Sequence, residues 1–158
     1  MRVTILAIGR VRSGPERDLL DDYLDRATAS GRALGLGPVA EREAEAPGGA
    51  DSEAEKILAQ IPKGATCILM DERGESQPTR QLASRIARLR DDGVRDLCFI
   101  IGGADGHGAA IRDAAVQGRW AKLAFGPQTW PHRLARVMLA EQIYRAISIL
   151  AGSPYHRD

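Results

Sequence analysis

The sequence of 158 residues has few of the residues that build metal centres, disulfide frameworks or membrane spans. It contains two cysteines and three histidines, with no Cys-x-x-Cys or Cys/His spacing of the kind that zinc sites use. Cys67 and Cys98 lie inside strand-like apolar runs, so we expect buried free thiols. No apolar run reaches the roughly 18 residues that a transmembrane helix needs. We therefore expect neither a bound metal nor a contact with a membrane.

The first residues also lack the features of a secretory signal. The segment MRVTILAIGRVRSG has a short apolar run flanked by arginines, and no small-residue cleavage pattern follows a long apolar core. This pattern is typical of a first β-strand, here residues 3–9. A cytoplasmic location is the default expectation for such a chain.

The sequence lacks an excess of charge of either sign, since the formal net charge is +1. A protein that holds nucleic acid by itself usually has a strong basic excess. Any contact with nucleic acid is therefore expected to be local, or shared with a larger partner. The predicted helix of residues 78–93 carries a row of arginines. An RNA-binding patch and a solvated helix face would both explain this row.

Apolar runs alternate with amphipathic helical patterns along the chain. Strands are predicted at residues 3–9, 65–71, 95–103 and 120–125, with a weaker strand within 34–43. Helices are predicted at residues 15–29, 52–61, 78–93, 107–118 and 132–150, with polar loops at 43–52 and 72–78. Ser52 and Glu55 have the spacing of a capping box. The alternation predicts a single α/β domain, residues 1–158, with a mainly parallel sheet covered by helices on both faces.

A glycine-rich loop, IGGADGHG, follows one buried strand and precedes a helix. Gly102, Gly103, Gly106 and Gly108 do not fit the G-x-G-x-x-G spacing of dinucleotide sites. Two of them have the spacing of a P-loop, but Ala109 stands where that motif requires lysine. A strand-to-helix turn that needs glycine for its backbone conformation would explain the loop equally well.

A second loop, FGPQTWP, also lies between a predicted strand and a helix. Ligands in open α/β sheets bind beyond the carboxyl ends of the strands. Three such ends, at Met70, Gly102 and Phe125, are expected to open on the same edge of the sheet. Because these loops offer no cluster of lysines, a ligand without phosphates fits better than ATP or NAD. S-adenosylmethionine (SAM), with its adenine, ribose and cationic sulfonium, fits this description.

Three segments together resemble a known family: FIIGGADG, TWPHRLARVMLAEQIYRA and the terminal PYHR. The chain resembles the ribosomal large-subunit methyltransferase family of the SPOUT superfamily. Its members N3-methylate a pseudouridine of 23S rRNA (position 1915 in the usual rRNA numbering). The resemblance is densest in the C-terminal third and extends over the whole chain.

The resemblance implies a deep C-terminal trefoil knot, within about residues 65–158, that holds SAM. It also implies a homodimer that acts on 23S rRNA within the assembled ribosome. The family often has a Ser-x-Met/Leu-Thr run before Pro-His, whereas this chain has Gly-Pro-Gln-Thr, which removes a hydroxyl. The tail ends in Asp158, where an acidic last residue is usual. The implied SAM contacts are Met70, Gly102, Gly103, Phe125, Gly126, Pro127, Gln128, Thr129 and Trp130.

The implied reaction needs a group that takes the weakly acidic N3 proton of the pseudouridine and a positive group near the charge that develops. A positioned base contributes roughly 100- to 10,000-fold to such a reaction. His132 is expected to be neutral, because a helix N-terminus disfavours imidazolium. A hydrogen bond that fixes the loop would also explain this residue. His107 is expected mainly to cap or orient the glycine loop.

The tail offers a ring for base stacking, an imidazole for proton transfer and a guanidinium for phosphate contact, although tails are usually disordered. Arg145 is a weaker candidate, since a pair with Glu141 four residues earlier is an ordinary intrahelical contact. The catalytic candidates are therefore His132, Arg145, Tyr155, His156 and Arg157.

The predicted helix of residues 132–150 is apolar around most of its circumference. A dimer interface would explain this pattern, with the tail of one subunit completing the site of the other. An alternative to the enzyme is a non-catalytic, SAM-binding, ribosome-associated factor. A phosphate-binding nucleotide enzyme is disfavoured, because neither glycine motif of such enzymes is present.

Overall fold

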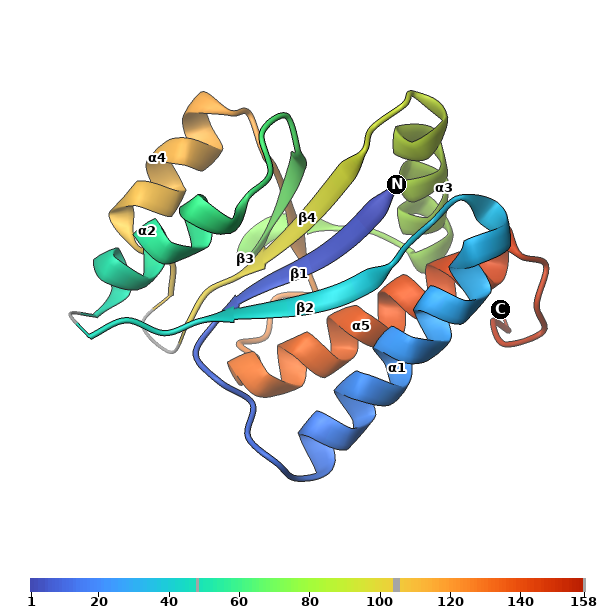
Figure 1. Ribbon diagram of the computed structural model, residues 1–158, viewed down its shortest axis with the longest axis horizontal. Coiled ribbons are helices and arrows are strands. Elements are labelled where there is room, and N and C mark those ends of the chain that lie inside the picture. The colour runs from blue at the N-terminus through green and yellow to red at the C-terminus, as the bar shows by residue number, and fades with distance from the viewer. Residues whose placement is uncertain (48, 104–105, 158) are drawn as a thin grey trace.

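Five strands, all paired in parallel, form the centre of the computed structural model, which describes residues 1–47, 49–103 and 106–157 (Figure 1). Their order across the sheet is β2-β1-β4-β3-β5. The parallel α/β architecture that the sequence predicts is therefore confirmed, whereas the trefoil knot stays a prediction. The strands are β1 (Arg2–Ile8), β2 (Val39–Ala44), β3 (Thr66–Ser76), β4 (Asp96–Ile101) and β5 (Ala121–Ala124).

Helices cover both faces of the sheet (Figure 1). The helices are α1 (Pro15–Gly31), α2 (Ala50–Gln60), α3 (Thr79–Asp91), α4 (Ala109–Gln117) and α5 (His132–Leu150), with a short 3₁₀ helix at Arg32–Leu34. Side chains of a strand alternate between the two faces. Accordingly, Ile5 and Phe99 pack with α1, α3 and α5, whereas Leu6 and Ile100 pack with α2 and α4. The free thiols of Cys67 and Cys98 are buried, as expected.

The capping box predicted for α2 is wrong. The helix begins at Ala50, and its N-cap position is Gly49, whose positive φ turns the chain into the helix. Ser52 therefore lies inside the first turn, where its hydroxyl cannot serve as the N-cap. An acidic first turn, with Asp51 and Glu53, offers the favourable charge at this helix end instead.

The polar loop predicted at residues 72–78 is mostly strand. β3 continues to Ser76, with a shift in register against β5 between Met70 and Glu75, so that both residues pair with Leu123. A Cβ on Gly74 would lie 2.6 Å from the backbone nitrogen of Leu123, so the excursion passes close to β5 at a glycine. Polar composition hid this strand because the excursion, residues 71–74, turns its side chains toward solvent or the pocket described below.

The apolar circumference of α5 has a cause within the single chain. α5 packs against α1, α3 and the sheet, and Leu139, Ile143 and Ile147 are fully buried there (Figure 1). The pattern therefore reflects burial on several sides of one helix. It no longer supports a dimer interface along the whole helix, and a charged residue at position 143 would test folding instead of association.

Among the described residues, no helix is long and apolar enough to cross a membrane. The described part of the chain also brings together no group of three or more His, Cys, Asp or Glu side chains that could hold a metal ion.

Candidate active site

A pocket of about 710 Å³ lies at the carboxyl ends of β4 and β5 and beside Met70 of β3, where the excursion begins. Its volume is within the usual size range of small-molecule sites. Its wall is more apolar than polar, and the two glycine-containing loops and the β3 excursion surround it. The prediction that Met70, Gly102 and Phe125 open on one edge is confirmed. The predicted SAM contacts that line the pocket are Met70, Gly102, Gly103, Phe125, Gly126, Gln128, Thr129 and Trp130, and Pro127 is an exposed member of the same loop.

The first glycine loop is shaped by close packing. A Cβ on Gly102 would lie 2.8 Å from the carbonyl oxygen of Gly106, and one on Gly103 would lie 2.8 Å from the Cγ2 atom of Ile8. The N–H of Gly103 donates to Gly106 (3.2 Å), and the reverse bond spans 3.1 Å. Larger residues would push the loop away from β1. Ala104 and Asp105, which complete the motif, lie outside the described residues.

His107 joins the glycine loop to Met70 of β3, where the excursion begins. Its Nε2 lies 2.8 Å from the carbonyl oxygen of Met70, which can only accept, so Nε2 carries the proton. Burial lowers the pKa of His107 and keeps the ring neutral. Nδ1 is then an acceptor, and it is buried without a hydrogen-bond partner among the described residues. The expected orienting role is confirmed, and one unused acceptor remains in the pocket wall.

The second loop is held by two side-chain contacts, one within the loop and one to the β3 excursion. The indole N–H of Trp130 donates to the carbonyl of Phe125 (3.2 Å), and the hydroxyl of Thr129 lies 3.4 Å from a carboxylate oxygen of Glu72. Gly126 has a φ of 93°, which disfavours any residue with a side chain. The glycine that departs from the common family pattern therefore meets a conformational requirement of this loop.

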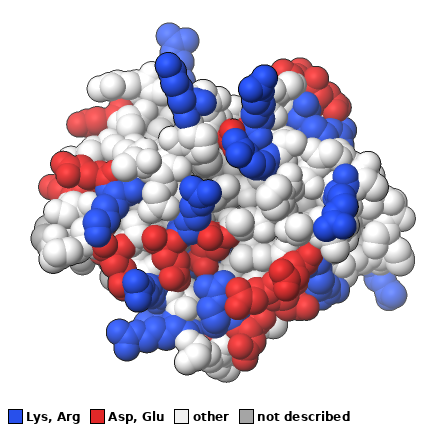
Figure 2. Space-filling model, in the orientation of Figure 1, with Lys and Arg blue, Asp and Glu red and all other residues white. Residues whose placement is uncertain are grey.

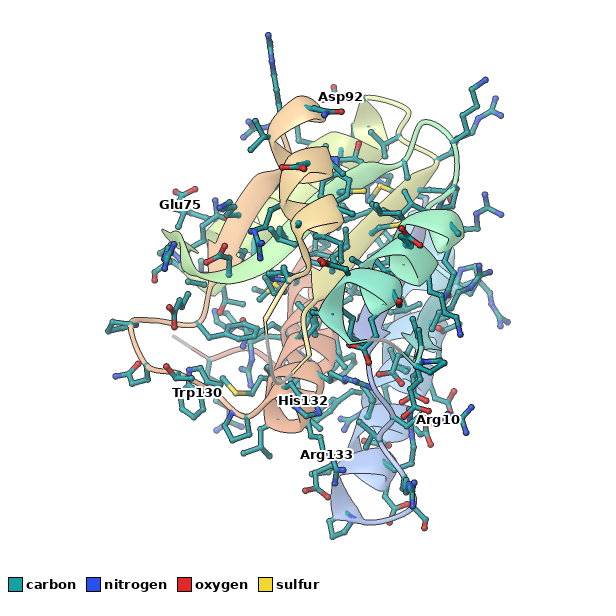
Figure 3. The ribbon with its side chains drawn as sticks, turned by 90° about the vertical axis from the view of Figure 1, so that its left-hand side faces the viewer. Arg10, Glu75, Asp92, Trp130, His132 and Arg133 are labelled. Carbon is teal, nitrogen blue, oxygen red and sulfur yellow. The ribbon has the colours of Figure 1, made fainter. Side chains whose placement is uncertain are left out.

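His132 begins α5 and lines the same pocket, near Trp130 and Arg133 (Figure 3). Burial lowers the pKa of His132, and the positive charges of Arg136 and Arg133 lower it further. The expectation of a neutral imidazole agrees with this environment. A neutral ring can accept a proton from a ligand held in the pocket.

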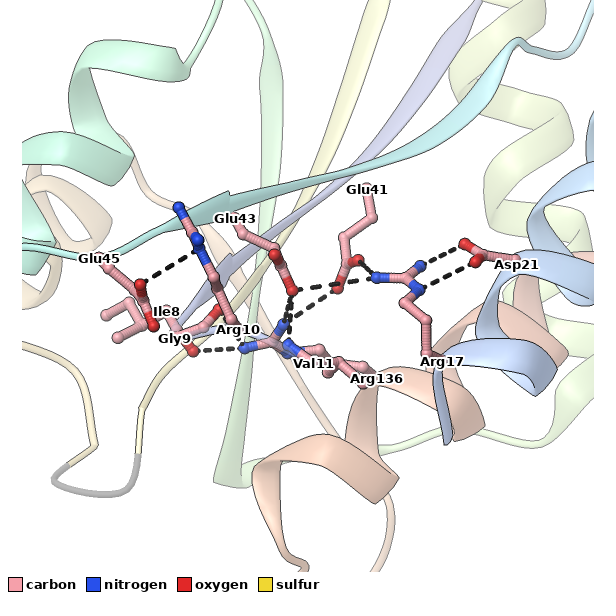
Figure 4. Close-up of polar contacts among 10 residues, drawn as sticks. All are labelled: Ile8, Gly9, Arg10, Val11, Arg17, Asp21, Glu41, Glu43, Glu45 and Arg136. Atoms are coloured by element: carbon pink, nitrogen blue, oxygen red, sulfur yellow. Dashed lines mark hydrogen bonds and ion pairs between the residues drawn. The ribbon is translucent and has the colours of Figure 1, made fainter. Parts of the chain in front are cut away.

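Arg136, one turn after His132, is a fully buried charge that the sequence reasoning missed (Figure 4). One of its guanidinium nitrogens lies 3.2 Å from Glu41 and 3.0 Å from Glu43. The other donates to the backbone carbonyls of Ile8 (2.5 Å) and Gly9 (2.9 Å). This network fixes the first turns of α5 to the carboxyl ends of β1 and β2. An arginine at an inward position of an apolar helix was the available signal.

The other catalytic candidates lie elsewhere. Arg145 follows His132 by 13 residues on α5, roughly 20 Å along the helix axis. Arg145 forms an ion pair with Glu141 (2.5 Å), and the hydroxyl of Tyr155 donates to the same carboxylate (3.0 Å). The tail is therefore held to α5 at Tyr155, and His156 and Arg157 follow this contact. None of the four residues lines the pocket in one chain.

The ring of Tyr155 lies in a cluster of aromatic and guanidinium groups. Its centroid is 4.6 Å from that of Tyr144, and the guanidinium carbons of Arg145 and Arg26 lie 4.7 and 5.5 Å from it. Burial and the Glu141 carboxylate raise the pKa of Tyr155, so its hydroxyl is neutral near pH 7. Tyr155 therefore offers a flat face and a donor, not a base.

Comparisons with known proteins identify the family of this chain. A family model described as "Predicted SPOUT methyltransferase" matches residues 1–156. The chain belongs to the SPOUT methyltransferase family. A relative from Phenylobacterium zucineum, named ribosomal RNA large subunit methyltransferase H, is 58% identical over 160 residues and covers all of both chains. A relative of the same name from Hyphomonas neptunium is 55% identical over 157 residues, or 99% of each chain.

A solved structure is similar at a lower level. It is a ribosomal RNA small subunit methyltransferase E from Neisseria gonorrhoeae bound to S-adenosyl methionine, 12% identical with a TM-score of 0.48. The match covers 95% of this chain and 66% of that one.

This SPOUT methyltransferase thus divides its candidate residues into two groups. His132 lies at the pocket, with the predicted cofactor contacts. Arg145 and the tail lie at the far end of α5. The sequence predicted both groups but not their separation.

Proposed function

We propose that this protein transfers a methyl group from SAM to N3 of a pseudouridine in 23S rRNA of the assembled ribosome. The observation that carries the proposal is a ligand-sized pocket at the carboxyl ends of β4 and β5, beside Met70 of β3, in a SPOUT methyltransferase. The relatives named ribosomal RNA large subunit methyltransferase H support the large-subunit rRNA as substrate. Because ribosomes are the proposed substrate, the proposal includes a cytoplasmic location.

The pocket suits SAM better than a phosphorylated nucleotide. Its described lining contains no lysine, and two carboxylates, Asp71 and Glu72, balance Arg73 and Arg112. The Nδ1 acceptor of His107 matches a donor such as the amino group of adenine or a ribose hydroxyl. Backbone groups at Met70 and along the 125–130 loop would hold the rest of the cofactor. When bound, SAM supplies a methyl group already activated by its sulfonium.

The chain's own residues then have to position the base and remove its N3 proton. Two imidazoles can accept that proton, His132 at the pocket and His156 in the tail. If His132 is the base, kcat/KM rises with pH through an apparent pKa below about 6.5, because the environment of His132 lowers its pKa. Substituting His132→Gln would remove this rise, whereas His156→Gln would leave it in place.

A homodimer would bring the two groups of residues to one site. Within one chain, roughly 20 Å of helix separates His132 from Arg145. Apolar groups near the pocket mouth remain exposed, including Trp130 (42%) and Leu134 (43%). Exposed apolar groups of this kind often mark interfaces. We propose that this region contacts a second copy whose tail completes the pocket.

We also propose that residues 65–158 form the trefoil knot implied by the family resemblance. If the two ends of the folded chain are joined covalently, the circular chain would keep the knot. In denaturant, this circular chain should elute as a smaller species than a chain that was circularised in the unfolded state. Equal elution of the two circles would contradict the knot.

The test of function is methyl transfer from labelled SAM to ribosomes that lack the modification, in parallel with free 23S rRNA. Mass spectrometry of the nucleosides should find N3-methylpseudouridine, and only with ribosomes. Absence of label in both samples, with SAM still bound, would instead favour a non-catalytic ribosome-associated factor.

A further inference from the structure

A second groove lies along α3, away from the cofactor pocket. It encloses about 710 Å³, and its basic lining residues are Arg80, Arg85, Arg88 and Lys122. Glu75, at the end of β3, is the only carboxylate among the described lining residues (Figure 3). We call the groove that these four basic residues line the arginine groove.

Two of the three arginines of this groove, Arg85 and Arg88, are paired differently from the arginines that hold α1 and α5 in place. Arg17, Arg136 and Arg145 each lie 3.0 Å or less from a carboxylate oxygen. Within the described residues, Arg85 and Arg88 form no ion pair and no side-chain hydrogen bond. By contrast, acidic and basic side chains lie side by side over the lower half of the face shown in Figure 2. The two groove arginines therefore keep their charge available for an external anion.

The sequence of α3 is not that of a helix face built for stability in water. A solvated face is usually stabilised by acidic and basic residues three or four positions apart. α3 has no acidic residue before Asp91, and its groove places Arg85 three positions before Arg88. Like charges at this spacing oppose helix formation by a few tenths of a kcal/mol. A bound polyanion would offset this repulsion.

The groove begins beside the cluster of aromatic and guanidinium groups that surrounds Tyr155. The hydroxyl of Thr79, the first residue of α3, donates to the side chain of Gln142 on α5 (2.9 Å). Gln142 in turn donates to Glu141, the carboxylate that holds Tyr155 and Arg145. A nucleic-acid strand lying along α3 would thus lead directly to the proposed substrate residues.

We propose that the arginine groove binds the phosphodiester backbone of ribosomal RNA next to the methylated nucleotide. The choice of ribosomal RNA as the partner in this inference rests on the proposed function. It also explains how a protein of net charge +1 holds RNA, since the basic charge is concentrated locally. Arginine suits the role because its planar fork matches phosphate oxygens.

The test measures binding to large ribosomal subunits that lack the modification, as a function of salt, for the full-length protein. The double variant Arg85→Ala/Arg88→Ala should bind more weakly, and its slope of log affinity against log salt should be shallower by about 1.5. Arg85→Lys/Arg88→Lys should keep most of the slope. Arg32→Ala/Arg95→Ala, which removes two exposed arginines outside the groove, is the matched control and should behave as wild type. SAM affinity should be unchanged in all of them.

Equal affinity and slope for the groove variant and wild type would overturn the proposal. So would an equal loss in the Arg32/Arg95 control, because the effect would then be one of total charge. Wild-type protein that shows no affinity for the subunits would overturn it as well. Wild type that binds through the groove but transfers no methyl group would support the groove and refute the proposed function.

Discussion

The two ends of α5 hold candidate catalytic residues in different ways. At the N-terminal end, His132 lies over a buried network in which Arg136 joins two carboxylates and two backbone carbonyls. At the other end, Arg145 and Tyr155 share one carboxylate and stack on each other near the surface. One end is fixed by buried charge, and the other by a half-exposed aromatic cluster.

The difference indicates what each end does. A rigid, partly buried environment suits a neutral imidazole beside a small ligand, because burial favours the uncharged ring. A partly exposed cluster of rings and guanidinium groups suits a large substrate that must enter and leave. In the proposed dimer, one helix would therefore serve the cofactor of one site at its start and the RNA of the other site at its end.

The most decisive test of this difference inactivates the two ends of α5 in different chains. His132→Ala and Arg145→Ala should each lower methyl transfer by at least about 100-fold. If one site takes His132 from one subunit and Arg145 from the other, mixed dimers contain one intact site. Mixing the two variants in equal amounts should then restore about a quarter of the wild-type activity.

The control for this experiment is the double variant mixed with an equal amount of wild type. This mixture should keep about a quarter of the wild-type activity if the sites are shared between subunits, and about half if each site lies within one chain. If both residues serve a site within one chain, every site of a mixed dimer lacks one of them. The mixture would then stay as inactive as its components.

The second largest effect concerns stability at the N-terminal end. Arg136→Met should lower the free energy of unfolding by about 3 to 5 kcal/mol. Glu41 and Glu43 lose the buried cation between them and keep only Arg17, which is partly exposed. Chemical denaturation followed by circular dichroism measures this loss. Arg10→Met removes a neighbouring but exposed pair with Glu45 and should cost less than about 1 kcal/mol (Figure 4). Equal effects of the two variants would show that the buried network contributes no more than a surface pair.

A smaller effect is expected from pH at the pocket wall. Burial lowers the pKa of His107 in the folded chain, so the unfolded chain binds a proton first as pH falls. The stability from neutral His107 is complete above about pH 6.5 and is lost below it, with a slope of at most about 1.4 kcal/mol per pH unit. His107→Gln should flatten the curve between pH 5 and pH 6.5, as measured by denaturation at each pH. Identical curves would contradict a neutral buried ring.

The smallest effect is expected at the tail. Tyr155→Phe removes one hydrogen bond to Glu141 and keeps the stacked ring, so the folded state should lose about 1 kcal/mol or less. Tyr155→Ala also removes the ring and should increase the mobility of the tail, seen as faster proteolysis near the C-terminus. If the two variants are equally stable, the ring contributes nothing to holding the tail.

Local patterns in the sequence predicted the helices, which follow from periodicity, and the residues that meet beyond the strands. The start of α5 at His132 and the meeting of Met70, Gly102 and Phe125 both followed from such patterns. The hidden part of β3 could not be predicted, because its polar residues Glu75 and Ser76 pair with β5, a contact between distant segments. Arg136 was missed for the same reason, since its carboxylate partners come from β2, 93 and 95 residues earlier.

The excursion in β3 has a consequence for how the pocket opens. Residues on both sides of it, Met70 and Glu75, pair with Leu123 of β5, so this rim is tied down at both ends. It cannot swing outward as a lid without breaking the edge of the sheet. The remaining movable wall is the loop of residues 125–131, whose Trp130 closes back on Phe125. Exchange of spent cofactor for fresh cofactor would therefore be timed by that loop and by whatever covers Trp130.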